Sequence, residues 1–283
     1  MSRIAYVNGR YVPHREAKVH VEDRGYQFSD GIYEVVAVSR GGFVDLEPHL
    51  DRLERSLREL RIAMPTTRAA LVVAMEEVVR RNRVADGIIY VQMTRGVAPR
   101  DHAFPARPRT QVVMTAKSTR PHPARYEEDG VKAVTVPEIR WQRCDIKSVS
   151  LLPNVLAKQA AREAGAYEAI FVTPDGVVTE GSSSNAWIVT RDGKLVTRAL
   201  SREILGGITR QTLMEIARDE GLEVVERPFT LEEARQAREA FVTSTTSYAM
   251  PVTQIDDTVV ANGKPGTICR KLRQRYIAYM ASA

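Results

Sequence analysis

Cysteine is scarce in this chain, and its two cysteines, Cys144 and Cys269, lie far apart in the sequence. Two distant thiols are not the pattern of a small secreted domain held together by disulfides. The first residues, MSRIAYVNGR, also lack the basic and then apolar profile of a secretory signal. We therefore expect a protein of the reducing cytoplasm.

Long apolar runs, internal repeats and low-complexity segments are also lacking. No stretch approaches the roughly 18 uninterrupted apolar residues that a membrane-spanning helix requires, so we expect no membrane partner. The five histidines show no spacing with cysteine that is typical of a metal site. We therefore expect no bound metal.

An excess of positive charge is present, with a net charge of +6 and a pI near 9.4. A dense basic face would favour nucleic acid, because it releases counterions from the phosphate backbone. The basic clusters at 80–83 and 270–275 are instead expected in or near the last turns of helices, where cations complement the helix dipole. We therefore expect no nucleic acid partner.

The composition is that of a globular protein, with 43% hydrophobic and 27% charged residues among 283. This length favours two domains. In the first half, Asn8-Gly9 between two short apolar runs predicts a β-hairpin, and residues 32–38 predict a buried strand that turns at Gly41-Gly42. Leucines at positions 50, 53, 57 and 60 predict a helix, as do residues 67–80, while 87–94 and 110–116 predict strands. We expect an N-terminal α+β domain over residues 1–118.

Charged residues and prolines without apolar periodicity predict a linker over residues 119–130. Beyond it, a strand begins at Val131, and a helix begins at Pro153 and stops at Gly165. Further signals are a strand within 167–173, a helix over 208–219, a Thr-x-x-Glu capping box at 230–233 and a terminal helix. We expect a second α+β domain over residues 131–283.

Three features of the second half favour one kind of chemistry. Lys147, in RCDIKS, lies between an apolar and a small residue, although most lysines in such a place only reach solvent. Glu180 ends a strand and is followed by three serines and an asparagine, and Gly206-Gly207 lead into a helix whose first amides suit a phosphate. A lysine for a Schiff base, a carboxylate for a pyridinium proton and a phosphate cup together describe the binding of pyridoxal 5′-phosphate (PLP).

The motifs RCDIKS, LAKQ, YEAI, TEGSSSN, GITR and FVTSTTS follow one another in an order that resembles bacterial D-amino acid aminotransferases. The N-terminal half agrees through EDRGYQFSDGIYEVV, HLDRL and TRGVAPRDHAFP, with Ser29 where a glycine is common. The resemblance implies two α/β domains of fold type IV, with the cofactor in the cleft between them. It implies that Lys147 is the catalytic Schiff-base lysine and that Glu180 is the partner of the pyridine nitrogen. The other cofactor-binding residues that it implies are Arg52, Ile208, Thr209, Ser244 and Thr245 at the phosphate, and Ser182, Ser183, Ser184 and Leu205 along the ring.

The resemblance also implies a substrate. Arg100 and His102, with Tyr33, match a trap for the substrate carboxylate, in which the Arg-x-His loop reaches in from the other subunit of a homodimer. The implied reaction is transamination of D-amino acids such as D-alanine with 2-oxoglutarate, which gives a 2-oxo acid and D-glutamate by a ping-pong mechanism. Two activities on the same fold remain open, namely branched-chain L-amino acid transamination and aminodeoxychorismate lyase.

Overall fold

The computed structural model describes residues 3–282, which form two compact units. The first unit contains the described residues up to Arg120 together with Ile146–Ser150, and the second contains Pro121–Asp145 and Leu151–Ser282. Each unit combines helices with a mainly antiparallel sheet, so the expected α+β class is confirmed.

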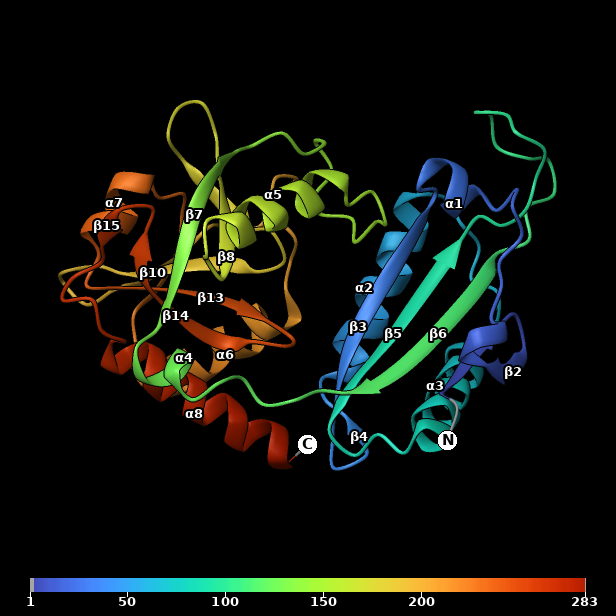
Figure 1. Ribbon diagram of the computed structural model, residues 1–283, viewed down its shortest axis with the longest axis horizontal. Coiled ribbons are helices and arrows are strands. Elements are labelled where there is room, and N and C mark those ends of the chain that lie inside the picture. Colours follow the sequence, from blue (N-terminus) through green and yellow to red (C-terminus); the bar gives the residue numbers. More distant parts are fainter. Residues whose placement is uncertain (1–2, 283) are drawn as a thin grey trace. The chain divides into compact units, whose positions relative to one another are not determined.

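In the first unit, the described strands form one antiparallel sheet in the order β2-β1-β6-β5-β3-β4. Helices α2 and α3 pack against this sheet (Figure 1). Leucines of α2 enter the core between them. The strands are β1 Ile4–Val7, β2 Arg10–Pro13, β3 Gly31–Ser39, β4 Gly42–Phe43, β5 Gly87–Thr94 and β6 Gln111–Ser118. The helices are the 3₁₀ helix η1 His14–Glu16, α1 Arg24–Phe28, α2 Leu46–Glu59 and α3 Arg68–Asn82.

The turns of this sheet show how far local sequence decides geometry. Asn8 and Gly9 both have positive φ, of 49° and 88°, as a two-residue type I′ hairpin turn requires. The second turn lies one residue earlier than expected, because Arg40 and Gly41 have positive φ and Gly42 already belongs to β4. The turn accordingly uses only the first of the two glycines.

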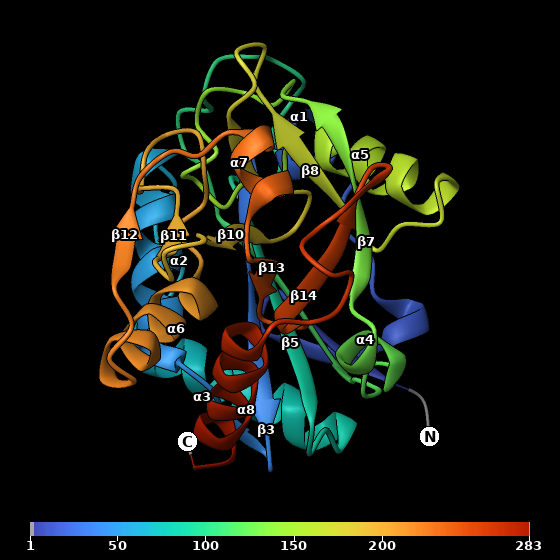
Figure 2. The ribbon, with the colours of Figure 1, turned by 90° about the vertical axis from the view of Figure 1, so that its left-hand side faces the viewer.

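In the second unit, the described strands form a mixed sheet in the order β12-β11-β10-β13-β14-β7-β8-β9, with β15 beside β14. Helices α6 and α8 pack against β13 and α8 also contacts β14, whereas α5 packs against β7 and β8 (Figure 2). The strands are β7 Val131–Pro137, β8 Glu168–Val172, β9 Val178–Gly181, β10 Asn185–Val189, β11 Leu195–Thr197, β12 Val224–Glu226, β13 Glu239–Ser244, β14 Tyr248–Ile255 and β15 Thr258–Val259. The helices are α4 Arg125–Glu128, α5 Leu152–Glu163, α6 Ile208–Asp219, α7 Leu231–Gln236 and α8 Thr267–Ser282.

The division into units differs from the expected one at two places. The expected linker, 119–130, contains α4, which packs against β14 of the second unit. The segment Ile146–Ser150, which includes Lys147, belongs to the first unit because it hydrogen-bonds to β3. Lys147 is therefore carried by the first unit and not by the C-terminal one.

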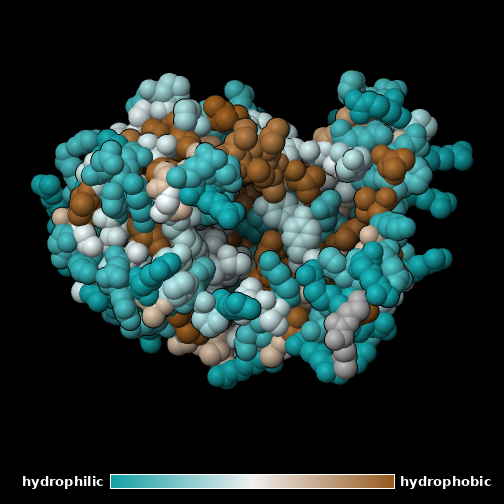
Figure 3. Space-filling model, in the orientation of Figure 1, coloured by the Kyte–Doolittle hydropathy of each residue, from teal (hydrophilic) through white to brown (hydrophobic). Residues whose placement is uncertain are grey.

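The basic clusters also need one correction. Residues 80–83 do end α3, but 270–275 lie in the middle of α8 and not near its end. There Arg273 is buried and pairs with Glu127, and Lys271 pairs with Glu220. Hydrophilic residues cover much of the visible face of both units (Figure 3). Arg273 and Lys271 thus form ion pairs within the second unit.

Candidate functional site

The backbone of Lys147 and of its neighbour Val149 is held by three hydrogen bonds. Its carbonyl accepts a hydrogen bond from the amide of Tyr33 at 2.9 Å, and the amide of Val149 donates to the carbonyl of Gly31 at 3.0 Å. Its own amide donates to Ser56 Oγ at 3.3 Å. The ammonium lies 4.2 Å from the centre of the Tyr33 ring, a cation–π contact. This lysine is therefore oriented by β3 and does not simply extend to solvent.

Arg52 belongs to a buried cluster that the sequence did not indicate. Its Nε and Nη2 donate to the two carboxylate oxygens of Glu34 at 2.8 and 2.7 Å, and His49 Nδ1 lies 2.8 Å from the same carboxylate. Burial alone would raise the pKa of Glu34, but Arg52, with His49, lowers it to about 2. The pKa of His49 is lowered, and burial is the main cause. The sequence did contain one signal for this cluster, because Glu34 is a charged residue within the apolar run of β3.

Arg100 and His102 lie on an exposed loop and share one aromatic neighbour. The Arg100 guanidinium lies 4.7 Å from the centre of the Phe28 ring, and the His102 ring lies 5.3 Å from it. Tyr33 instead stacks on Tyr90 at 5.6 Å and faces Lys147. The first unit thus brings Arg100 and His102 together, and it brings Tyr33 together with Lys147.

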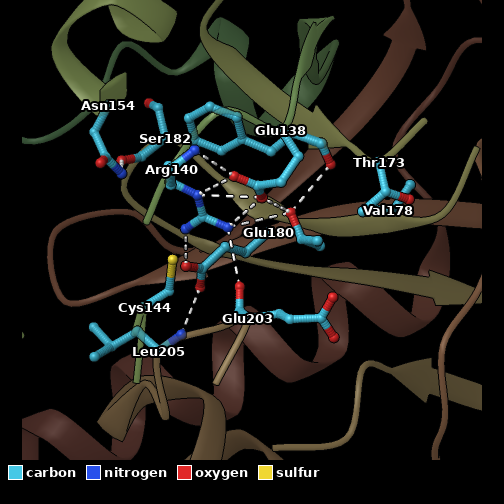
Figure 4. Close-up of polar contacts among 12 residues, drawn as sticks. Glu138, Arg140, Cys144, Asn154, Thr173, Val178, Glu180, Ser182, Glu203 and Leu205 are labelled. Atoms are coloured by element: carbon cyan, nitrogen blue, oxygen red, sulfur yellow. Dashed lines mark hydrogen bonds and ion pairs between the residues drawn. The ribbon is translucent and has the colours of Figure 1, made fainter. Parts of the chain in front are cut away.

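Glu180 is the buried carboxylate of the second unit. One oxygen accepts a short hydrogen bond from Arg140, and the other accepts from the amide of Leu205 at 3.0 Å (Figure 4). The second oxygen also accepts from Asn185 Nδ2 at 3.1 Å. Burial raises the pKa of Glu180, against the opposing effect of Arg140. Its position at the end of β9, beside the start of β10, follows from the Gly-Ser-Ser-Ser link that joins these strands.

Arg140 is shared between two carboxylates, and this decides the charge of the site. It also donates to Glu138, with Nη2 to Oε2 at 2.6 Å (Figure 4). Its side chain is only 4% exposed. Ionised, Glu138, Arg140 and Glu180 carry two negative charges and one positive charge. Buried charge favours a neutralising partner, and a protonated pyridine nitrogen supplies one positive charge. These residues therefore fit a pyridinium cofactor.

The serines that follow Glu180 donate to a second buried carboxylate. Ser184 Oγ donates to Glu168 at 2.8 Å, Ser183 Oγ lies 3.5 Å from it, and Ser182 makes a short hydrogen bond to it. The resemblance implied that these serines lie along the cofactor ring. In the structure their hydroxyl groups donate to Glu168, which the sequence did not indicate.

The start of α6 has the features of an anion site. Gly207 is its N-cap and offers no side chain to the first amides, those of Ile208 and Thr209. A Cβ added to Gly207 would lie 2.1 Å from Asn185 Oδ1, so the backbone passes close to β10. Asn185 Nδ2 also donates to the carbonyl of Leu205 at 2.8 Å. One asparagine therefore connects Glu180 with the segment that leads into this helix.

The hydroxyl cluster after β13 lies beside these residues in the sheet. Asn185 of β10 pairs with Thr243 of β13, so Ser244 and Thr245 follow at the same edge. Ser244 Oγ lies 2.6 Å from Ser247 Oγ, which fixes this turn. Helix α6 packs against β13, so the expected phosphate-binding residues of the second unit come from neighbouring elements.

Comparisons with known proteins show the family of this chain. The family model of amino-transferase class IV matches residues 31–255, and the chain belongs to this family. The chain is 41% identical to a D-alanine aminotransferase of Staphylococcus epidermidis over 98% of both chains, and 40% identical to one of Bacillus licheniformis over 94% and 93%. It is also similar to a branched-chain amino acid aminotransferase of Thermobaculum terrenum, solved in its PLP form, with a TM-score of 0.84, 28% identity and coverage of 99% and 94%. The resemblance and the type IV fold expected from the motifs are thus confirmed.

Proposed function

Because the chain belongs to the class IV aminotransferase family, we propose that it transfers the amino group of D-amino acids such as D-alanine to 2-oxoglutarate. The products are a 2-oxo acid and D-glutamate, formed by a ping-pong mechanism. The observation that carries the proposal is the buried carboxylate of Glu180, whose cationic partner, Arg140, is shared with Glu138. The chain is 40 to 41% identical, over nearly its full length, to proteins named D-alanine aminotransferase, and this supports the choice of substrate.

Pyridoxal 5′-phosphate is the cofactor of this family, and when bound it takes up the electron pair that remains after the α-proton of the amino acid leaves. Lys147 would hold it covalently, and Glu180 would face its ring nitrogen. Other residues would bind the remaining groups. These are Arg52, the amides of Ile208 and Thr209, Ser244 and Thr245 at the phosphate, and Ser182, Ser183, Ser184 and Leu205 along the ring.

Lys147 would also move the proton. After the substrate amine has taken the place of Lys147 on the cofactor, the freed Nζ would take the α-proton of the substrate and return it at the cofactor carbon, which requires a neutral amine within reach of both atoms. The backbone contacts to β3 restrict where Nζ can go, and the Tyr33 ring borders it. Such restriction is the requirement for proton transfer at a defined position.

Glu180 would keep the ring nitrogen protonated. With both carboxylates ionised, one positive charge among Glu138, Arg140 and Glu180 leaves a net charge of −1 in a buried setting. A nearby cation is therefore stabilised relative to its neutral form. The hydrogen bonds from Asn185 and Leu205 hold the carboxylate in one orientation while it does so.

Substrate specificity would come from Arg100, His102 and Tyr33. Guanidinium and imidazole groups together bind a carboxylate by charge and by hydrogen bonds. We propose a homodimer in which Arg100 and His102 act in the neighbouring active site. Held in this way, the D-amino acid would direct its α-proton to Lys147.

The chain would work in the cytoplasm. Its two cysteines are free thiols, as in a reducing compartment. Within residues 3–282, no helix has the length and apolar character needed to cross a membrane.

The first experiment compares two amino donors. Purified protein loaded with pyridoxal 5′-phosphate is mixed with 2-oxoglutarate and either D-alanine or L-valine, and the 2-oxo acid from each donor is measured. Pyruvate from D-alanine alone is expected. Turnover of L-valine would favour the branched-chain activity, which the similarity to the Thermobaculum terrenum enzyme keeps as the second candidate. Without transamination of either donor, cleavage of aminodeoxychorismate would favour the lyase.

Two substitutions test the residues of the mechanism. Lys147→Ala should abolish turnover, while Lys194→Ala, at an exposed lysine of the second unit, should not change it. Glu180→Gln should lower kcat by about 100-fold or more, because loss of a nearby charge is worth several kcal/mol in a buried site. Full turnover by either Lys147→Ala or Glu180→Gln would contradict the assigned role.

A further inference from the structure

The loop that carries Arg100 and His102 has exposed side chains but a firmly held backbone. Arg24, which is 3% exposed, donates from its guanidinium to three consecutive carbonyl oxygens of this loop. The distances are 2.5 Å to Asp101, 3.2 Å to His102 and 3.2 Å to Ala103. One buried side chain thus fixes the backbone on both sides of His102.

Arg24 is itself fixed from two directions. Its Nε donates to Asp30 at 2.8 Å, and its backbone amide donates to the carbonyl of Gly96 at 2.9 Å. Asp30 also accepts from the buried Arg95, at 2.7 and 2.9 Å. The two arginines hold the pKa of Asp30 below its usual range against the effect of burial, so it stays ionised. The guanidinium of Arg24 therefore has little freedom to leave the loop.

Phe28 fixes the side chains as Arg24 fixes the backbone. Its ring centre lies 4.7 Å from the Arg100 guanidinium, 5.3 Å from the His102 ring and 4.9 Å from the Arg24 guanidinium. Cations are attracted to the face of an aromatic ring, and the ring is rigid. The separation between Arg100 and His102 is thus set by contacts with one half-buried side chain.

We propose that Arg24 and Phe28 are positioning residues that set the spacing of Arg100 and His102 for a carboxylate. The proposal rests on the proposed function of Arg100 and His102. Two groups bind one carboxylate well only when their separation is fixed before binding, because ordering an exposed loop on binding would weaken affinity. The assignment also accounts for the segment EDRGYQFSD, to which the proposed reaction gives no other role.

The decisive variant is Phe28→Leu, which keeps apolar volume but removes the ring face. It should raise the Michaelis constant for D-alanine at least tenfold and leave kcat within about twofold. The inhibition constant of propionate, which has the carboxylate but no amino group, should rise by the same factor. Tyr26→Leu is the matched control, since Tyr26 is 77% exposed on the same helix, and it should change neither constant.

Arg24→Lys is the second variant, because lysine keeps the charge beside Asp30 but lacks the planar donors that reach three carbonyl groups. It should shift the same two constants in the same direction. If it fails to fold, Phe28→Leu alone decides. An unchanged Michaelis constant and propionate inhibition constant in Phe28→Leu would overturn the proposal.

A double-mutant cycle separates positioning from general packing. In an Arg100→Ala background, Phe28→Leu should cause a clearly smaller further rise in the Michaelis constant than it causes in the native protein. Full additivity would refute positioning through Arg100. An unchanged Michaelis constant in Arg100→Ala alone would contradict the proposed carboxylate trap, whereas a raised constant there with no effect of Phe28→Leu would contradict only the present inference.

Discussion

Replacement of Glu34 by glutamine tests how the first unit holds Arg52. Glu34 is buried between Arg52 and His49 and receives hydrogen bonds from both. Glutamine preserves the shape but removes the charge. Its NH2 group would also point its hydrogens at the N–H groups of Arg52 or at His49, where the carboxylate oxygen of Glu34 accepts. The variant should therefore lose stability and should hold Arg52 less firmly.

The size of the effect follows from the pKa of Glu34. Its pKa falls from 4.5 to about 2 on folding, which corresponds to about 3 kcal/mol of stability when the group is ionised in both states. Because the folded pKa is lowered, this contribution is complete well above pH 4.5 and is lost as the pH falls toward 2. At pH 3.5 about 1 kcal/mol of it should be gone.

Urea unfolding of the native protein and of Glu34→Gln at pH 6 and pH 3.5 measures this directly. At pH 6 the variant should be less stable by about 3 kcal/mol, and the difference should shrink by about 1 kcal/mol at pH 3.5. Glu34 raises the pKa of His49, so removing Glu34 would also change how strongly His49 destabilises the fold in acid; the comparison is therefore made in a His49→Asn background. A difference of equal size at both pH values would refute the reasoning.

The same variant tests the link to the cofactor. If Arg52 binds the phosphate, Glu34→Gln should also weaken the binding of pyridoxal 5′-phosphate, measured by its absorbance on titration into the apoprotein. Glu47→Gln is the matched control, because Glu47 is 69% exposed beside Arg68 and should matter little for stability or binding. Unchanged cofactor affinity in Glu34→Gln would contradict the role of Arg52.

Two further predictions concern the second unit. Gly207→Ala should weaken cofactor binding, because its Cβ would lie 2.1 Å from Asn185 Oδ1, whereas Gly206→Ala meets its nearest atom only at 3.6 Å and serves as control in the same titration. Equal affinities of these two variants would contradict the close approach at Asn185. Thr230→Ala should lower the free energy of unfolding by about 1 kcal/mol, because Thr230 and Glu233 form a reciprocal capping box, and kcat should not change. Urea unfolding checks this, and a cost near zero would argue against the cap.

Local sequence was sufficient where one residue type dictates local backbone geometry. The hairpin at Asn8 and Gly9, the bounds of α6 and the cap at Thr230 were all predicted and are confirmed. Each depends on contacts within a few residues, such as a turn, a helical period or a cap. The turn after β3 was misplaced by one residue, since two successive glycines satisfy the local rule in two ways and strand pairing selects one.

The sequence by itself determined the resemblance, the fold class and the choice of Lys147 and Glu180 as the residues to test, because those signals lie in short motifs. Only the tertiary structure decided what surrounds them. The hydrogen bonds of Lys147 to β3, the pairing of Glu34 with Arg52 and the sharing of Arg140 join side chains or backbone groups from different elements. Such contacts form because strands that are far apart in the sequence pair with one another. A local pattern of residues does not predict that pairing.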